Sequence, residues 1–484
     1  MRNVALVVLD TVRKDYFDEY APRLRMASDA SFEGCRAASS WSVPSHTSIF
    51  TGDLPSEHGV HAESFDAAFD FSSVGVEDTF LGDLPARHTV GLSANSYINS
   101  HFGFDALFEE FHDFSIGSHT GESLFTEGAS VHEYMRRTDE PNPAKRYLGY
   151  LRECLGHEHV AKSVANGAWI KVGPIVKTLP VPEFVDDGAG VVTEAAVEAV
   201  ADAEEPWFLF ANYMDAHTPL RNLIQHDRSL HSVPNSWSST RMDKWELNAD
   251  GLATEEYAAN YRDVYGASID YLDRTVTGLV RRLREATDRE TTVVVTADHG
   301  HNLGYDADDG LFHHTGSMSE GVMHVPLEIF NAPDGYPATE RRLFSHLDLG
   351  DLLVSLAHGE KPDDDLFRDR VPAETVGLLG GDNATWGREF SEEEDAWWNR
   401  MTRCVYEGTT KREWNSVGER FVYGLDPDRP SWQERVDDEA AVPEAETALF
   451  ETDLEAYKER AAATSQDAEF DEAVENHLKQ LGYL

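Results

Sequence analysis

Three short apolar runs, each followed closely by acidic or histidine side chains, constrain the fold of this chain more than any other feature. The runs are Asn3–Leu9 (NVALVVL), Pro206–Tyr213 (PWFLFANY) and Thr291–Thr296 (TTVVVT). Continuous β-branched and aromatic runs of this length are typical of strands buried on both faces of a parallel sheet. Helical periodicity between them predicts an α/β fold, with a doubly wound, mostly parallel sheet flanked by helices.

Polar side chains stand where these predicted strands end. Asp10 follows the first run, Asp215 and His217 follow the second, and Asp298 and His299 follow the third. Ligands of open α/β sheets bind outside the carboxyl ends of the strands, so one site is expected along this edge. The alternative is that such an aspartate merely caps the next loop.

The segment Trp41–Gly52 (WSVPSHTSIFTG) adds a hydroxyl group to this edge. Proline lacks an amide hydrogen and is tolerated in a helix only in its first turn, so Pro44 predicts a helix that begins almost at Ser42. The unpaired amides and the positive end of the helix dipole would attract an anion there. Ser42 is therefore a candidate nucleophile that faces a bound oxyanion, the alternative being a serine that caps the helix.

One divalent cation could be held by four of these residues together, Asp10, Ser42, Asp298 and His299. Carboxylate and hydroxyl oxygens suit Ca²⁺, Mg²⁺ or Mn²⁺, whereas the imidazole shifts the preference towards Mn²⁺ or Zn²⁺, so the metal stays open. A cation in contact with the serine oxygen would lower its pKa and create a nucleophile at neutral pH. His217 and His314 would then bind ester oxygens or protonate the leaving group.

The charge of the chain excludes several classes of partner. With 88 acidic and 41 basic residues, the formal charge is −47, and the acidic residues are spread over the whole length. Such a surface repels nucleic acid and anionic lipid. Because 41% of the residues are hydrophobic, disorder does not explain this composition, and a halophilic, archaeal source is predicted.

Cysteine usage and hydropathy indicate the compartment. Cys35, Cys154 and Cys404 are widely separated and match neither a disulfide framework nor a zinc motif, which favours a reducing, cytoplasmic location. The apolar run at the N-terminus is cut by Asp10, so it is neither a signal peptide nor a membrane span. We expect no membrane span elsewhere in the chain.

Two divisions of the chain are expected from its composition. Residues 1–360 should form the catalytic α/β domain, interrupted by a helical insertion at about 115–187 in which we recognise no chemistry. Beyond Gly359 the acidic fraction rises and the apolar runs shorten, which predicts a smaller C-terminal subdomain over residues 361–484. It should contain antiparallel strands between Thr402 and Leu425 and a helical tail from Glu451.

Ordered blocks along almost the whole chain resemble the sulfatase family of the alkaline phosphatase superfamily. They include LVVLDTVRKD, SVPSHTSIFTGDLPSEHGV, GFDALFEEF, FANYMDAHTPL, VVVTADHGHNLG and HHTGSMSEGVMHVPL. The resemblance implies that Asp10, Asp298 and His299 are metal ligands, that Ser42 stands in the position of the nucleophile, and that His217 and His314 contact the substrate. For Arg13 and His46 the resemblance implies a role in the site, and a purely structural role is expected equally. We expect packing or surface roles for five other histidines, His58, His61, His101, His313 and His324.

The chain departs from the family pattern at two positions. Thr11 stands where many members have a second aspartate, so the metal would have one carboxylate fewer. Family sulfatases carry a cysteine or serine in C/S-x-P-S-R that is oxidised to formylglycine, and here His46 replaces the arginine. We therefore expect Ser42 to stay unmodified, with formylglycine as the alternative. An unmodified serine favours phosphate esters, because phosphoserine can be hydrolysed at phosphorus whereas a serine sulfate is attacked slowly by water.

These features predict a metal-dependent hydrolase of sulfate or phosphate esters, acting on a small anionic ester or on a sulfated or phosphorylated glycan. One alternative is a phosphotransferase of the same superfamily that acts on a glycan or lipid headgroup, although the acidic surface and the missing membrane segment are unfavourable for it. Another is a relative that only binds an anionic glycan. The complete set of Asp10, Ser42, Asp298 and His299 argues against that reading.

Overall fold

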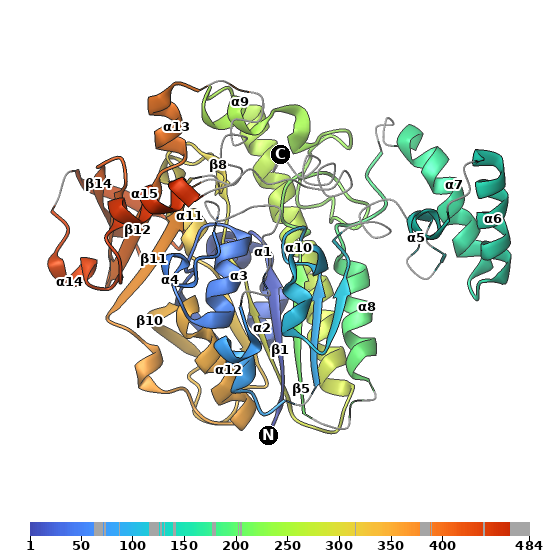
Figure 1. Ribbon diagram of the computed structural model, residues 1–484, viewed down its shortest axis with the longest axis horizontal. Coiled ribbons are helices and arrows are strands. Elements are labelled where there is room, and N and C mark those ends of the chain that lie inside the picture. The colour runs from blue at the N-terminus through green and yellow to red at the C-terminus, as the bar shows by residue number, and fades with distance from the viewer. Residues whose placement is uncertain are drawn as a thin grey trace.

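The computed structural model describes most of the chain. The described ranges are residues 1–61, 74–86, 88–115, 131–138, 142–176, 181–201, 206–314, 316–377, 390–438 and 441–464. Residues 71, 125, 203 and 388 and the pair 128–129 are also described. Figure 1 shows a central sheet covered by helices, a smaller sheet beside it, and a group of helices that stands apart.

The central sheet has eight strands in the order β10-β2-β9-β6-β1-β5-β3-β4. Among the described pairings, β9 is antiparallel to β6 and to β2, and the others are parallel. The predicted mostly parallel α/β sheet is therefore confirmed. The strands span Asn3–Leu9 (β1), Ala30–Arg36 (β2), His88–Ser93 (β3), Glu110–Asp113 (β4), Trp207–Tyr213 (β5), Thr291–Thr296 (β6), Leu327–Phe330 (β9) and Thr339–Ser345 (β10).

The three apolar runs of the sequence form the centre of this sheet. β1 lies between β5 and β6, with Val4 opposite Phe208 on one side and Thr292 on the other. Every residue of the three strands is buried, as their uninterrupted apolar character requires. Because the three strands are parallel neighbours, the polar residues that follow them meet at one edge.

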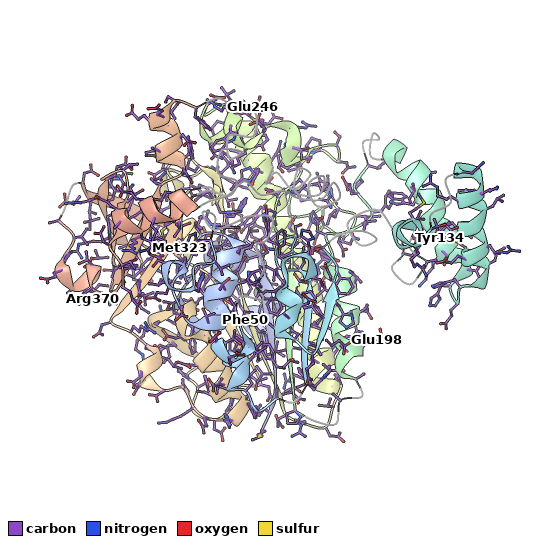
Figure 2. All side chains as sticks on the ribbon, in the orientation of Figure 1. Phe50, Tyr134, Glu198, Glu246, Met323 and Arg370 are labelled. Carbon is purple, nitrogen blue, oxygen red and sulfur yellow. The ribbon has the colours of Figure 1, made fainter. Side chains whose placement is uncertain are left out.

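Helices cover both faces of the sheet (Figure 1). The long helix α10 (Glu255–Glu285) packs against α1 (Lys14–Tyr20), α2 (Pro22–Ala27) and α8 (Ala189–Val200). On the other face, α12 (Leu349–His358) packs against α3 (Ser42–Thr51) and β1. Figure 2 places Phe50 of α3 inside the body, where its ring meets those of Phe104 and Phe210 edge to face.

The sequence predicts a short helix over residues 22–30, a turn over 54–60 and a loop over 103–111, and the structure differs at all three. The helix ends at Ala27, and the unforeseen strand β2 begins at Ala30. The predicted loop ends in β4, and the predicted turn contains the short helix α4, Pro55–His58. In each case pairing or packing with distant residues decides the local conformation; β2, for example, is held between β9 and β10.

The C-terminal part contains a five-stranded antiparallel sheet, in which the predicted strands between Thr402 and Leu425 are confirmed. The flanking strands β11 and β15 were not foreseen. The division expected at residue 360 stays a prediction, and the part of the helical tail beyond Thr464 lies outside the described residues. The elements are β11 (Arg370–Val376), α13 (Glu392–Trp398), β12 (Met401–Glu407), β13 (Thr410–Asn415), β14 (Arg420–Leu425), β15 (Gln433–Asp438), α14 (Glu444–Thr447) and α15 (Leu454–Thr464).

The expected insertion contributes three helices that project from the body in Figure 1. They are α5 (Val131–Arg137), α6 (Pro143–Gly156) and α7 (Val160–Val176). Figure 2 shows Tyr134 lying among them. The beginning of the expected insertion, residues 116–124, lies outside the described residues. None of the helices in the described ranges combines the length and apolar content needed to cross a bilayer.

The short elements that complete the described chain lie mostly near the carboxyl edge of the central sheet. They are α9 (Lys244–Asn248), β7 (Asn302–Leu303), β8 (Phe312–His313) and α11 (Glu320–Met323). β7 and β8 pair with each other as an antiparallel ribbon. This ribbon carries the chain from Asp298 and His299 to His314.

Candidate active site

Ser42 is the first residue of α3, as the position of Pro44 predicted. Trp41 is the cap residue, with an extended φ of −154°. The Ser42 side chain does not cap the helix. Its hydroxyl donates instead to Oδ2 of Asp10 at 3.0 Å, so the hydroxyl points from the helix start to the end of β1.

Three buried atoms beside Ser42 have no hydrogen-bond partner among the described residues. They are Oδ1 of Asp10, Oδ2 of Asp298 and Nε2 of His299. These three side chains offer ligand atoms that all lie within 4.8 Å of one another. A buried polar atom without a partner costs free energy, and a divalent cation would satisfy all three together.

The second polar atom of each of these side chains is held in place. Oδ1 of Asp298 accepts from the backbone amides of His299 at 2.8 Å and Thr11 at 3.2 Å. Nδ1 of His299 lies 2.9 Å from the carbonyl oxygen of Gly300, so Nδ1 carries the proton and Nε2 keeps its lone pair. The donor set is therefore two carboxylates and a neutral imidazole, which fits a divalent metal ion.

Thr11 takes no part in this donor set. Its backbone has a φ of 61°, which is rare for a β-branched residue, and its hydroxyl donates to the carbonyl oxygen of Asp10 at 2.7 Å. Tyr265 holds the same turn, because its hydroxyl donates to the carbonyl oxygen of Thr11 at 2.6 Å. The strained turn thus presents the Thr11 amide to Asp298.

Burial dominates the electrostatics of the site. It raises the pKa of Asp10 to about 6, with a further contribution from the charge of Asp298. It also raises the pKa of Asp298 to about 7. The same burial lowers the pKa of His299 and of His217. Two carboxylates that resist ionisation next to neutral imidazoles are typical of a site that is completed by a cation.

The structure brings the two candidate substrate histidines to the same place. His217 follows β5, and its Nδ1 lies 2.6 Å from the carbonyl oxygen of Thr218. Its ring centroid is 5.9 Å from that of His314, which in turn is 4.6 Å from that of His299. Both histidines therefore lie next to the proposed ligands, although they come from distant parts of the chain.

Asn95 is a further member of the site that sequence reasoning did not assign. Its amide nitrogen donates to Oδ2 of Asp10 at 2.6 Å and to Oγ of Ser42 at 3.1 Å. Its amide oxygen accepts from the backbone of Tyr97 at 2.8 Å, which fixes the orientation of the amide. The available signal was its position just after β3, because polar residues follow strand ends throughout this site.

His301 was also missed, although it lies two residues after His299. Its Nε2 is 2.7 Å from the Tyr261 hydroxyl, and its ring is nearly parallel to those of Tyr261 and Tyr265. His313, for which we expected a packing or surface role, has its ring centroid 5.6 Å from that of His301. The ring centroid of His301 is also 6.4 Å from that of His217 and 6.1 Å from that of His314, so His301 belongs to the same group of histidines.

Arg13 and His46 make structural contacts, and His46 also lies beside a proposed ligand, with its Nδ1 3.6 Å from Oδ2 of Asp298. Arg13 is buried and paired with Asp15 at 2.7 Å and with Asp308 at 3.1 Å. Nδ1 of His46 lies 2.8 Å from the carbonyl oxygen of Ser42, and Asn212 donates to its Nε2 at 3.1 Å. Burial lowers the pKa of His46 to about 3, so this side chain is neutral and does not supply the charge of the arginine it replaces.

The remaining histidines lie where we expected them. His58, His61 and His324 contact Ser48, Tyr457 and the carbonyl oxygen of Glu33, respectively, and His101 is exposed. These are packing or surface positions outside the donor set.

Comparison with known proteins identifies the family. A family model of the sulfatases matches residues 2–359. The chain therefore belongs to the sulfatase family, and the predicted enzyme class, a sulfatase-like ester hydrolase, is confirmed. No curated protein sequence matches this chain.

Solved structures share the fold. A phosphonate monoester hydrolase from Silicibacter pomeroyi is similar with a TM-score of 0.54 and 15% identity, over 88% of this chain and 89% of that one. A 2-O GAG sulfatase is similar with a TM-score of 0.56 and 12% identity, over 93% and 89%. An enzyme solved with its substrate D-glucosamine-2-N,6-O-disulfate has a TM-score of 0.51 and 14% identity, over 96% and 98%. At these identities the likeness concerns the fold.

Proposed function

We propose that this protein is a metal-dependent hydrolase of sulfate or phosphate esters that uses Ser42 as its nucleophile. The observation that carries the proposal is the convergence of three unpartnered buried atoms, from Asp10, Asp298 and His299, beside the Ser42 hydroxyl. Asp10, Asp298, His299 and Oγ of Ser42 would hold the cation. When bound, a divalent cation would lower the pKa of the hydroxyl and offset the negative charge of the ester.

The other groups of the site act on the ester itself. The first amides of α3 lie at the helix start, at Ser42, where the helix dipole would favour the negative charge of a bound ester. Nδ1 of His217 donates to the Thr218 carbonyl, so Nε2 is the atom that would face the ester, and it carries no proton while the imidazole is neutral. His314 would approach the same ester. Either imidazole would first take up the proton that Ser42 releases and would then pass it to the leaving alkoxide. Asn95 fixes the positions of the Asp10 and Ser42 side chains relative to each other, because its amide nitrogen donates to both.

We favour phosphorus esters over sulfate esters. The Ser42 oxygen would attack phosphorus as the bond to the leaving oxygen breaks, and water would then cleave the phosphoserine at phosphorus. His46 lacks the charge of the family arginine, which supports an unmodified Ser42. Structures with this fold include a phosphonate monoester hydrolase and a sulfatase of sulfated glycans. A sulfated or phosphorylated glycan is therefore a reasonable substrate to include in a screen.

An activity screen tests this proposal. Protein loaded separately with Ca²⁺, Mg²⁺, Mn²⁺ or Zn²⁺ would be assayed at high salt with aryl sulfate, aryl phosphate, aryl phosphodiester and aryl phosphonate substrates, and with a sulfated and a phosphorylated glycan. The Ser42→Ala variant is the control. Turnover of a phosphorus ester by the native protein and not by the variant supports the proposal. Turnover of aryl sulfate alone would reverse the preference for phosphorus, and no turnover with any metal would favour the glycan-binding alternative.

We also propose a cytoplasmic location in a halophilic cell. The support is the acidic composition and the three cysteines, which are all free and buried. Activity and thermal stability that rise with KCl concentration are the expected result, because counterions screen the repulsion between carboxylates.

A further inference from the structure

The helical hairpin formed by α6 and α7 has a charge opposite to that of the rest of the chain. The chain as a whole has 41 basic and 88 acidic residues. Residues 143–176 instead hold five basic residues, Lys145, Arg146, Arg152, Lys162 and Lys171, and two acidic ones, Glu153 and Glu158. In Figure 1 the hairpin projects from the body, so its own charge sets the local electrostatic potential.

The two helices are joined by residues 157–159 and contact each other along one line. The Tyr150 hydroxyl donates to the carbonyl oxygen of Ser163 at 2.8 Å. The helices approach closely at Gly167, where a Cβ atom would lie 2.6 Å from the ring of Tyr150. Cys154 of α6 is buried one turn further along. The contact line therefore runs through Tyr150 and Cys154 on α6 and through Ser163 and Gly167 on α7.

Each helix exposes a stripe of large apolar side chains next to this line. On α6, Tyr147, Leu148 and Leu155 are 50%, 65% and 73% exposed. On α7, three valines spaced four or eight residues apart are 37% to 48% exposed, namely Val160, Val164 and Val172. Successive residues of an α-helix are rotated by about 100° about its axis. On both helices the apolar stripe is rotated by about 100° from the contact line, in the same sense when each helix is viewed from its N-terminus. Because the two helices are antiparallel, equal rotations in the same sense place both stripes on one face of the hairpin.

Basic side chains border this face. Lys145 and Arg152 are exposed and lie on the outer side of the α6 stripe, next to Leu148 and Leu155. The structure shows no ion pair for either residue among the side chains that it describes. An apolar stripe bordered by lysine and arginine is the pattern of helices that lie in the interface of an anionic bilayer.

We propose that this face, defined by Tyr147, Leu148, Leu155, Val160, Val164 and Val172, docks onto the surface of an anionic lipid bilayer. Two observations favour lipid over a second copy of the chain. The hairpin is basic, so two hairpins repel each other, and each copy would bring a body of strongly negative charge towards the other. The helices are also too short or too polar to span a membrane, so the docking is interfacial.

This docking is independent of the ester-cleaving site. The overall charge of −47 predicts repulsion from anionic lipid, but the chain carries that charge unevenly. The hairpin meets the membrane first, and the acidic body stays further away, where salt screens its charge over about 8 Å at about 0.15 M and over about 3 Å at about 1 M.

Sedimentation with vesicles tests the proposal. The full chain would be mixed with vesicles of phosphatidylglycerol and phosphatidylcholine in equal parts, or of phosphatidylcholine alone, at about 0.15 M and about 1 M KCl. The test variant is Leu148→Glu with Leu155→Glu. The matched control is Met26→Glu with Leu252→Glu, which changes two exposed apolar residues outside the hairpin. A third variant, Lys145→Gln with Arg152→Gln, removes the two bordering charges.

We expect the native protein to sediment with the anionic vesicles. The partition coefficient of the Leu148→Glu, Leu155→Glu variant should be at least about tenfold lower, which is the factor expected for the loss of one buried leucine side chain. The Met26 and Leu252 control should bind like the native protein. The Lys145 and Arg152 variant should lose the preference for phosphatidylglycerol. Retained ester hydrolysis and circular dichroism would show that the variants are folded.

Native protein that stays in the supernatant with both vesicle types would overturn the proposal, as would a Leu148→Glu, Leu155→Glu variant that sediments normally. A dimer seen by light scattering that this variant dissociates, without vesicle binding by the native protein, would assign the face to a second copy. None of these outcomes depends on whether Ser42 is the nucleophile.

Discussion

The Ser42 hydroxyl donates a 3.0 Å hydrogen bond to Oδ2 of Asp10, which ties the start of α3 to the end of β1. The other oxygen of Asp10 is left without a partner and faces Asp298 and His299. One carboxylate therefore both positions the proposed nucleophile and offers a ligand atom. Because of this double role, a change that moves the Asp10 carboxylate should affect both the proposed nucleophile and the proposed metal site.

Replacing Asp298 by alanine should lower metal content and activity together. The substitution removes one of two carboxylates, and with it both a ligand atom and the charge that holds the cation. We expect kcat/KM to fall by more than about 10²-fold. Elemental analysis beside steady-state kinetics measures both quantities, with the exposed Asp227→Ala as the control. Full metal content with normal turnover would refute the proposed metal site.

Replacing His217 by alanine should have a different effect. If its imidazole meets the substrate, metal content should stay near normal while kcat/KM falls by about 10²-fold, the scale of a lost general acid or oxyanion donor. The exposed His101→Ala serves as the control. Loss of metal in the His217 variant would instead make this residue a ligand.

The chemical state of Ser42 decides between phosphorus and sulfur chemistry. We expect the peptide from Trp41 to Ser48 to have the mass of unmodified serine. Formylglycine would reduce that mass by about two units, the two hydrogens lost when the alcohol becomes an aldehyde. Mass spectrometry of the native protein distinguishes the two. Normal turnover by Ser42→Ala would contradict the nucleophile assignment itself.

Replacing Asn95 by alanine should slow the reaction without removing the metal. The variant loses donors to Asp10 and to Ser42, so both side chains become less well oriented. Loss of such orienting contacts typically costs about 10- to 100-fold. We expect the loss in kcat, with KM little changed, and metal content measured on the same samples. A metal-free Asn95→Ala protein would show that Asn95 acts on the metal and not on the nucleophile.

Glu328 should make folding stability depend on pH. This fully buried carboxyl of β9 accepts from the Ser28 hydroxyl at 2.6 Å and from Ser31 at 2.9 Å, and burial raises its pKa to about 7. The folded state binds this proton more tightly than the unfolded state, so its stabilisation is complete below pH 4.5 and is lost as the pH rises to about 7. By pH 8 the loss amounts to about 3 kcal/mol.

The Glu328→Gln variant should avoid this loss, because an amide cannot ionise. Its thermal midpoint should match that of the native protein near pH 5 and exceed it above pH 7. Scanning calorimetry across this range measures the difference, with the exposed Glu360→Gln as the control. Parallel pH profiles for the native and Glu328→Gln proteins would contradict the assignment.

The sequence by itself determined the centre of the molecule. β1 and β6 have the predicted bounds, and α3 begins at Ser42, because uninterrupted β-branched runs and a proline in the first helical turn are local signals. The residues that follow those strands could be grouped into one candidate site, since parallel neighbours end at the same edge. The family could be recognised because its ordered motifs are contiguous stretches of the sequence.

Tertiary structure alone decided the rest. β2 has no strong apolar pattern and forms because β9 and β10 pair with it. Asn95 joins the site through its hydrogen bond to Asp10, 85 positions away, and His301 joins it because its ring lies near those of His217 and His314. Likewise, only the packing of α6 on α7 shows that their apolar stripes share one face. These features depend on contacts between distant residues, and the local periodicity of a sequence does not encode which distant residues will meet.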